Sequence, residues 1–413
     1  MLIRPCFLDV TPPLTPKSSS ACDNVYTAAA PCLLLRAPLV SPSVRYFRKY
    51  SGTYVPRHEK AEHRGDVLDW FTSYLSGRTQ HVRCGNYSSV PTPVTCGIPQ
   101  GSVLGPILFI LYTAFLSRLI QNHGLNPHMY ADDTQIYGAC SPAEVLQLQQ
   151  RVAACIDDVA AWMRENRLQF NAAKTEVIWC ATSRRQYQIP HNPIRVGLDD
   201  IHPVSSVRNL GIFLDSDISM KKHVAKTVSS CFAVLRQIRS IRRSVTRPVV
   251  MSLITALVMT KLDYGNATLA GLPSRYLNQL QCVLHAAARL VFSARKTDHV
   301  TPLLRELHWL RVPERISYKL ATLVFRCLHG IAPPYLANEL HRVTDIEGRQ
   351  RLRSASTVSL VVPSARLSTV GDRAFPVAAA RVWNNLPPHV RLSPSLPAFK
   401  WRLKTTFFLQ SFV

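Results

Sequence analysis

The sequence is short of acidic residues, of paired cysteines and of long apolar runs. Its 413 residues hold 25 Asp and Glu against 49 Lys and Arg, which gives a formal net charge of +24. This balance favours polyanionic partners, with nucleic acid the first candidate and a solvated basic surface without a partner the alternative. The 11 cysteines form no C-x-x-C pair and no Cys/His cluster at zinc-finger spacing, which argues against a structural zinc site. The longest apolar stretch, 103–116, is shorter than the roughly 20 residues of a spanning helix, so no membrane partner is expected.

The composition indicates a folded chain of two or three domains. A hydrophobic fraction of 47% is high enough to build a core, and the length exceeds the roughly 250 to 300 residues that one core usually holds. Residues 1–64 contain many prolines and no sustained period of 2 or 3.6 residues, so we expect irregular or disordered chain there. An ordered domain is predicted to begin near Gly65, with a helix over 67–75 that ends at Gly77.

A helix flanked by short strands is predicted in the middle of the chain. Ser141–Glu144 combines an N-cap serine, a first-turn proline and a capping-box glutamate. Apolar residues then recur every three or four positions as far as Met163, which is the pattern of a helix with one packed face. Residues 168–170 and 176–180 are typical of short strands. The fold class is therefore predicted to be α+β.

The pattern turns helical beyond Asp215. Apolar residues form a stripe from Val224 to Ile238, and basic residues occupy much of the remaining helix surface. Such a helix suits a phosphate backbone, while an ordinary solvated face is the alternative. The basic positions predicted to bind nucleic acid are Lys222, Lys226, Arg236, Arg239, Arg242 and Arg243. Further helices are expected over 248–261, 274–295 and 313–328.

The adjacent acids Asp132 and Asp133, within Met129–Tyr137, are the sharpest local feature. Residues that favour strands flank them on both sides, which predicts a hairpin that presents both carboxylates together. Like charges held so close are costly unless a cation neutralises them, so a divalent metal is predicted. The pairs Asp157–Asp158 and Asp199–Asp200 serve as controls, and both are predicted to lie on solvated surface.

A glycine-bearing loop precedes the acidic hairpin at Gly97–Pro106. Its small residues let a backbone approach a ligand closely, although a plain turn into a helix is the alternative. The loop and the hairpin, in this order and at this separation, resemble motifs B and C of reverse transcriptases from non-LTR (LINE-type) retrotransposons. Three further stretches are similar to the same family: Leu168–Glu176 to motif D, Leu210–Asp215 to the primer-grip motif E, and Trp70–Arg78 to the helix before motif B.

The C-terminal stretches His329–Leu336, Gly371–Phe375 and Trp383–Pro387 are also similar to this family, so the resemblance covers about residues 66–410. It implies four regions along the chain. These are an unrelated region over 1–64, a partial polymerase palm of antiparallel sheet with packed helices over 65–215, a helical thumb over 216–300, and the helical C-terminal region of the retroelement polyprotein over 301–413.

The resemblance also implies roles for single residues. Members of the family add nucleotides with two Mg²⁺ ions held by palm aspartates, and they use an RNA template, a DNA primer and deoxynucleoside triphosphates. By position, Asp132 and Asp133 match catalytic metal ligands. Lys174 matches the lysine that gives a proton to the departing pyrophosphate, although a plain surface lysine is the alternative. The remaining matches are Tyr130 near the primer terminus, Gln100, Gly101 and Ser102 in the pocket for template base and nucleotide, and Leu210 and Gly211 in the primer grip.

The sequence departs from the family at motif A, which carries another metal-binding aspartate. The region where it is expected, Val40–Lys49, has no acid, and Asp9 lies too far upstream. The fingers and the endonuclease domain are not found either. The resemblance thus implies an N-terminally truncated enzyme with an incomplete two-ion site and little or no activity alone. A non-catalytic nucleic-acid-binding remnant, or the translation product of a decayed element, is the alternative. We expect an intracellular protein, nuclear or cytoplasmic, and no protein partner is implied.

Overall fold

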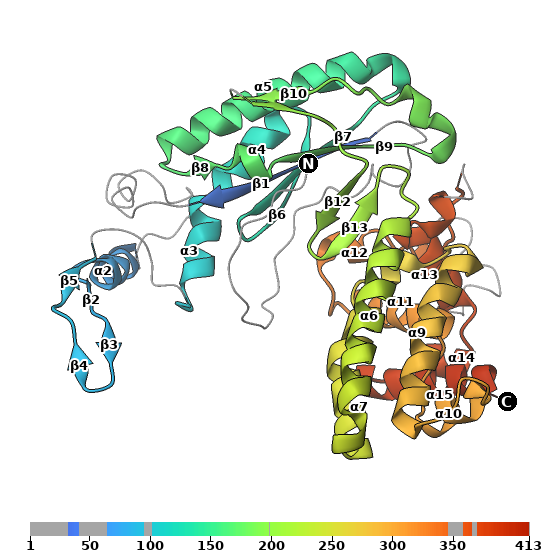
Figure 1. Cartoon of the computed structure of the whole chain (residues 1–413). Helices are drawn as coiled ribbons and strands as arrows, with labels where there is room; N and C mark the ends of the chain where they lie inside the picture. The colour runs from blue at the N-terminus through green and yellow to red at the C-terminus, as the bar shows by residue number, and fades with distance from the viewer. Residues whose placement is uncertain are drawn as a thin grey trace. The chain divides into compact units, whose positions relative to one another are not determined.

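The fold combines helices with small antiparallel sheets, as an α+β class requires (Figure 1). The computed structural model describes residues 32–40, 64–94, 101–197, 199–345, 358–365 and 370–412. These residues divide into two compact units: the first holds 33–178 and 190–203, and the second holds 179–189 and 204–412. In the described parts of the chain, every helix is too short or too polar to cross a bilayer.

The first unit begins with a helix and two small hairpins. Helix α2 (Arg64–Leu75) confirms the helix predicted over 67–75, and Gly77 follows it with a φ of 65°. Strand β2 (Thr79–Gln80) pairs with β5 (Thr92–Pro93), and β3 (Arg83–Cys84) pairs with β4 (Tyr87–Ser88). Two short helices come next, α3 (Gly105–Tyr112) and α4 (Ala114–Asn122).

A five-stranded sheet forms the centre of the first unit. Its path runs β6 (Asn126–Tyr130), β7 (Asp133–Ala139), β1 (Cys32–Val40) and β8 (Gln169–Phe170), and β9 (Glu176–Cys180) also pairs with β1. Both β8 and β9 confirm predicted strands. Strand β1 lies inside the range 1–64, for which irregular chain is predicted, and the rest of that range up to residue 63 lies outside the described residues. Pro38 explains the difference, because proline in a central strand argues against strand formation.

Helix α5 (Val145–Glu165) packs beside α4 and the sheet (Figure 1). It follows a 3-10 turn, Pro142–Glu144, in which the backbone N–H of Ser141 donates to the Glu144 carboxylate at 2.9 Å. That hydrogen bond lowers the pKa of Glu144. The apolar stripe is buried as predicted: Leu148, Val152, Ile156, Val159 and Met163 are all 1% exposed or less. A further hairpin, β10 (Ile194–Val196) with β11 (Asp199–Ile201), completes the unit.

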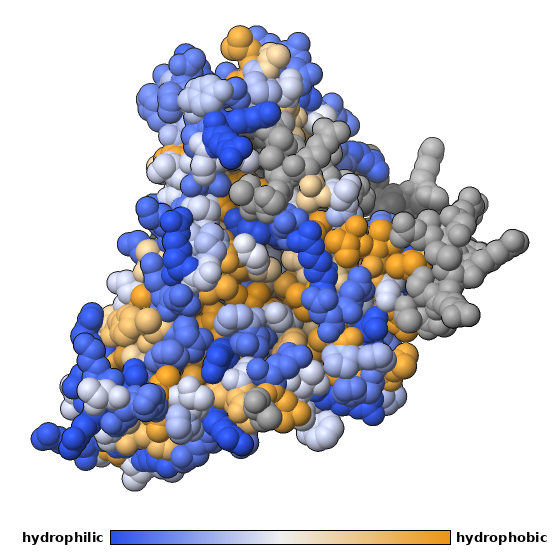
Figure 2. Space-filling view, turned by 90° about the vertical axis from the view of Figure 1, so that its right-hand side faces the viewer, coloured by the Kyte–Doolittle hydropathy of each residue, from blue (hydrophilic) through white to orange (hydrophobic). Residues whose placement is uncertain are grey.

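The second unit is a hairpin followed by helices. The hairpin pairs β12 (Ser206–Asn209) with β13 (Ile212–Asp215). The helices are α6 (Lys221–Ile241), α7 (Arg247–Ile254), α8 (Thr260–Asp263), α9 (Ser274–Phe292), α10 (Val300–Glu306), α11 (Val312–Leu328), α12 (Pro334–Ala337), α13 (Phe375–Asn384), α14 (Pro388–Arg391) and α15 (Leu396–Phe412). A short 3-10 segment lies at Ala172–Lys174 in the first unit. Those of the second unit lie at Ser183–Gln188, Arg242–Ser244, Asn266–Leu269, Val343–Asp345 and Gly371–Arg373. Figure 2 shows one face of the molecule, where hydrophilic side chains surround smaller apolar areas.

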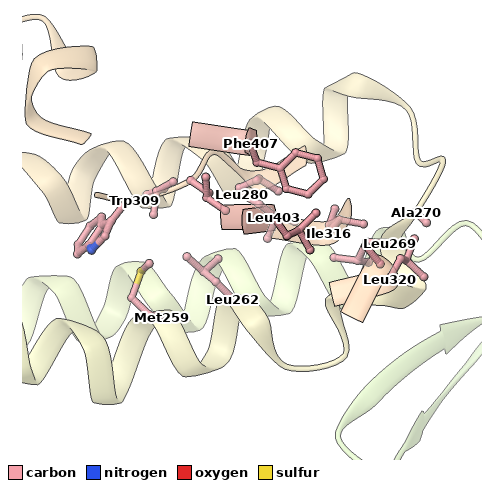
Figure 3. Packing of buried hydrophobic residues seen from close by; sticks show 14 of the residues in the cluster. Met259, Leu262, Leu269, Ala270, Leu280, Trp309, Ile316, Leu320, Leu403 and Phe407 are labelled. Atoms are coloured by element: carbon pink, nitrogen blue, oxygen red, sulfur yellow. The ribbon is translucent and has the colours of Figure 1, made fainter. Parts of the chain in front are cut away.

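The helices of the second unit share one hydrophobic core. Its buried residues run along the sequence from Met220 to Phe407, and α6, α7, α9, α11, α13 and α15 all contribute to it. Figure 3 shows part of this core, with Met259, Leu280 and Phe407 among the labelled residues. The ring of Phe399 stacks on Phe325 at 4.5 Å and on Trp383 at 5.7 Å between ring centres. The core therefore crosses residue 300, where the sequence analysis separates a thumb from a C-terminal region.

Candidate functional site

The acidic pair lies at the tip of a hairpin, as predicted. Strands β6 and β7 pair in register, with Tyr130 opposite Asp133, so Ala131 and Asp132 form a two-residue turn. Ala131 has a φ of 51°, which is the left-handed conformation that tight hairpin turns require at their first central residue. Asp133 is 7% exposed, Asp132 is partly exposed, and the Tyr130 side chain is 54% exposed. The turn thus presents one acid toward solvent and holds its neighbour inside.

The position of β7 explains why this turn is well defined. The strand runs inside the sheet between β6 and β1, and residues Asp133 to Gly138 are all buried. The two control pairs behave as predicted. Asp157–Asp158 lies on the exposed face of α5, with the Asp158 carboxylate 2.9 Å from His123 Nε2, and Asp199–Asp200 is exposed on β11. Burial of one acid beside a tight turn therefore distinguishes the Asp132 pair from the others.

Part of the glycine-bearing loop lies outside the described residues, including Gln100. Gly101 has a φ of 87°, and Ser102 Oγ lies 2.6 Å from the Tyr74 hydroxyl of α2. The Tyr74 ring stacks on Trp70, so Ser102 is hydrogen-bonded to one member of an aromatic pair. Helix α3 begins at Gly105, as the loop pattern predicts. Sequence reasoning missed the Tyr74 contact, because the two residues are 28 positions apart.

Lys174 closes a short 3-10 turn between β8 and β9. The Asn171 side chain accepts a hydrogen bond from the Lys174 backbone N–H at 3.2 Å, and the Thr175 hydroxyl donates to the Asn171 carbonyl at 2.9 Å. Thr175 is buried, whereas Lys174 is partly exposed. Asn171 and Thr175 therefore fix the backbone from which the Lys174 side chain extends, in the same unit as the acidic pair. The sequence signal for Asn171 and Thr175 was their position in the stretch Leu168–Glu176, which resembles motif D.

The two residues predicted for a primer grip form the turn of the β12–β13 hairpin in the second unit. Leu210 and Gly211 have φ values of 42° and 88°, the two left-handed positions of a tight hairpin turn. Tyr264 packs against this turn, since its hydroxyl donates to the Leu210 carbonyl. A Cβ atom at Gly211 would lie 2.9 Å from the Tyr264 ring, so the contact requires glycine as well. Tyr264 carries no local sequence signal, because it is 54 residues away from Leu210.

The predicted basic residues of the α6 region fall into two groups. Lys226, Arg236, Arg239 and Arg243 are exposed, and the exposed Lys222 donates to the Ser206 hydroxyl. Arg242 differs, because its guanidinium donates to the carbonyls of Leu290 and Val291, each at 3.2 Å. These carbonyls belong to the last turn of α9, where a cation stabilises the helix end. Arg242 therefore has a structural role in addition to its charge.

Comparison with known proteins agrees with the motifs and their order. The family "Reverse transcriptase (RNA-dependent DNA polymerase)" matches residues 55–214. The chain is 28% identical, over 59% of its length, to the probable RNA-directed DNA polymerase from transposon BS of Drosophila melanogaster. It is also 24% identical, over 59% of its length, to the one from transposon X-element, and 26% identical, over 37% of its length, to the polymerase from mobile element jockey, both of the same organism.

The matched segments cover only part of each relative: 28% of the BS protein, 27% of the X-element protein and 16% of the jockey protein. The family match contains the acidic hairpin, the motif D turn and the primer-grip turn. Residues 55–214 therefore match the reverse transcriptase family, and the chain is similar to RNA-directed DNA polymerases of non-LTR retrotransposons.

Proposed function

We propose that the chain provides part of an RNA-directed DNA polymerase, with an RNA template, a DNA primer and deoxynucleoside triphosphates as its substrates. In this proposal, residues 65–215 form the palm and the helices after 216 form the thumb. The observation that carries it is the β6–β7 hairpin, in which Asp132 and Asp133 occupy the turn and the first strand position after it. Tyr130 lies opposite Asp133 and is exposed, and in this proposal its side chain contacts the primer terminus.

The acidic pair does not by itself fit two metal ions. Reverse transcriptases use divalent metals, and two ions carry four positive charges that several carboxylates normally balance. Among the residues that the structure describes, no group of three or more His, Cys, Asp or Glu side chains could hold a metal. Strand β1, next to β7 in the sheet, has no acid in its sequence. We infer that the chain alone adds nucleotides poorly or not at all.

Primer extension tests this inference. The purified chain is incubated with an RNA template, an annealed DNA primer, Mg²⁺ and nucleoside triphosphates, beside an Asp132→Ala variant. We expect both proteins to extend the primer at background level. Mg²⁺-dependent extension that disappears in Asp132→Ala would show that the pair is sufficient for catalysis and would overturn the incomplete site.

Crosslinking tests the polymerase assignment independently of turnover. A primer with a photoreactive 3′-terminal nucleotide is annealed to RNA, irradiated with the chain, and the crosslinked peptides are identified by mass spectrometry. We expect adducts on the peptide that holds Tyr130 or on the peptide that holds Leu210 and Gly211. Adducts confined to other surfaces, from a complex shown to be bound, would refute the assignment.

A second candidate function is nucleic-acid binding without catalysis. The exposed cations of the α6 region favour it, because such side chains neutralise phosphates without any acidic centre. The two candidates differ in the role of the acidic turn. In a binding protein, Asp132→Asn leaves the position of the primer end unchanged, whereas in a polymerase segment it alters the crosslinks at Tyr130.

A further inference from the structure

The C-terminal motif Gly371–Phe375 has no place in the function described so far, yet it touches the connection between the β12–β13 hairpin and α6. Arg373 Nη1 donates to the carbonyl of Ile218 at 2.7 Å, a contact that spans 155 residues of sequence. Ile218 lies in the loop Ser216–Met220, directly between β13 and α6. Arg373 therefore contacts the loop that joins the β12–β13 hairpin to α6.

The loop has a backbone that needs support. Ile218 and Met220 have φ values of 55° and 59°, a left-handed conformation that is unfavourable for L-residues and especially for a β-branched one. The Asp215 carboxylate supports the far side of the loop, where it accepts from Ser219 Oγ and from the Lys222 backbone N–H, each at 3.1 Å. The Ile218 carbonyl is held by Arg373 instead. The strained residue thus has one local hydrogen bond, from its N–H to the Asp215 carbonyl at 2.8 Å, and one from a distant partner.

The arginine is itself held in place from two sides. Gly271, with a φ of 68°, lies so close that a Cβ atom there would be 2.8 Å from Arg373 Cγ. The preceding residue, Asp372, accepts from Arg381 Nη2 of α13 at 2.8 Å, and the following Ala374 is 3% exposed. The Arg373 side chain therefore leaves a fixed turn, passes over Gly271 and reaches the loop.

We propose that Arg373 is a positioning residue that couples the C-terminal helices to the loop Ser216–Met220 and thereby sets the orientation of the Leu210–Gly211 turn. The coupling itself follows from contacts within the second unit. Its consequence for a primer rests on the proposed polymerase function. The proposal gives the Gly371–Phe375 motif a task that its distance from the acidic turn in sequence does not suggest.

Amide hydrogen exchange measures the coupling without nucleic acid. In Arg373→Ala, we expect exchange of the amides in 212–222 to rise about tenfold, while amides of α11 and α15 keep their protection. Arg373→Lys retains one donor and restores part of the protection. The matched control is Arg402→Ala, which removes another arginine donor to a backbone carbonyl of the second unit, that of His389 at 2.8 Å, and leaves the Ile218 contact. A uniform rise across the second unit, or no change in 212–222, would overturn the proposal.

Crosslinking from a primer 3′ end then tests the effect on the Leu210–Gly211 turn separately from the coupling to the loop. We expect Arg373→Ala to lose most of the adducts on Leu210 and Gly211, and Arg373→Lys to recover part of them. Unchanged adducts in Arg373→Ala, together with faster exchange, would refute the effect on the turn. If the unaltered chain forms adducts neither there nor on the Tyr130 peptide while exchange still responds to Arg373→Ala, the coupling stands and the polymerase assignment fails.

Discussion

His223 is a buried histidine with a specific hydrogen-bonding task. It lies in the first turn of α6, 5% exposed, and its Nδ1 accepts from the backbone N–H of Phe213 at 3.5 Å. Burial lowers the pKa of His223, and the nearby Asp215 carboxylate opposes that effect in part. The neutral ring therefore serves the structure, because a protonated Nδ1 could no longer accept the hydrogen bond that joins the hairpin to the helix.

The buried His223 should lower the free energy of unfolding of the protein in acid. A pKa that is lower in the folded than in the unfolded state means that the unfolded chain takes up the proton first, so stability decreases as pH falls below about 6.5. The change in the free energy of unfolding caused by His223 is at most about 1.4 kcal/mol per pH unit, and this pH dependence disappears at higher pH, where the ring is neutral in both states. Urea unfolding at pH 7.5 and 5.5 measures it. His223→Asn keeps an acceptor but does not titrate, and its smaller pH dependence is the expected result; equal dependence would contradict the assignment.

Local residue patterns predicted the hairpin that carries the acidic pair, whereas contacts between residues far apart in the sequence could not be predicted from them. Asp132 and Asp133 were placed correctly at a hairpin turn, because the signal lies within nine residues of sequence. The use of Arg242 at the end of α9 could not be predicted, since the carbonyls that it meets are 48 and 49 residues away. The same holds for Tyr264 beneath the primer-grip turn. The helical period says which face is polar, but not what a polar side chain contacts.

Elements were predicted well where caps and periodicity agree. The helix at Val145–Glu165 combines both signals, and its start and its buried face follow from them. The segment predicted as one helix over 248–261 contains a π turn at Thr255–Met259, which side-chain periodicity does not distinguish from an α-helix. Strand β1 was missed because Pro38 disfavours a central strand, and only pairing with distant segments forms it.

The α6 region supplies a prediction about binding to nucleic acid. Arg236 and Arg239 lie three residues apart on α6 and are exposed, so they face one side. The exposed Arg243 follows in the 3-10 segment Arg242–Ser244. Changing all three to Glu should weaken binding to a primer–template duplex and lower the salt dependence. Each lost phosphate contact reduces the slope of log affinity against log salt by about 0.9. Filter binding at several salt concentrations measures both effects.

Arg242→Ala is the informative contrast for this experiment. Its loss leaves carbonyls of α9 without their donor, so we expect lower thermal stability, by about 1 to 3 kcal/mol, and little change in the salt slope. If the triple variant binds with an unaltered slope, the helix is an ordinary solvated surface. A slope change from Arg242→Ala alone would assign the phosphate contact to that residue instead.

For the whole molecule, the single core of the second unit predicts how the chain tolerates truncation. Residues 204–413 should unfold cooperatively on their own, whereas 204–300 should not. The shorter piece lacks Leu320, Phe325, Trp383 and Phe399, which are all 2% exposed or less. Burial of each contributes about 1.5 to 3 kcal/mol, against a total domain stability of about 5 to 15 kcal/mol. Thermal melts followed by circular dichroism test this, and a cooperative melt of 204–300 would show an independent thumb.

Strand β1 shows that the pairing of a strand in a sheet and the supply of metal ligands are separate requirements. A central strand pairs with its neighbours through backbone N–H and C=O groups, which any sequence in an extended conformation can supply. Strand β1 has the sequence Cys-Leu-Leu-Leu-Arg-Ala-Pro-Leu-Val, which pairs with β7 and contains no acidic residue. The requirements of a sheet and of a metal site therefore differ: an acidic residue introduced into β1 need not disturb the strand pairing, and intact strand pairing does not by itself indicate catalytic activity.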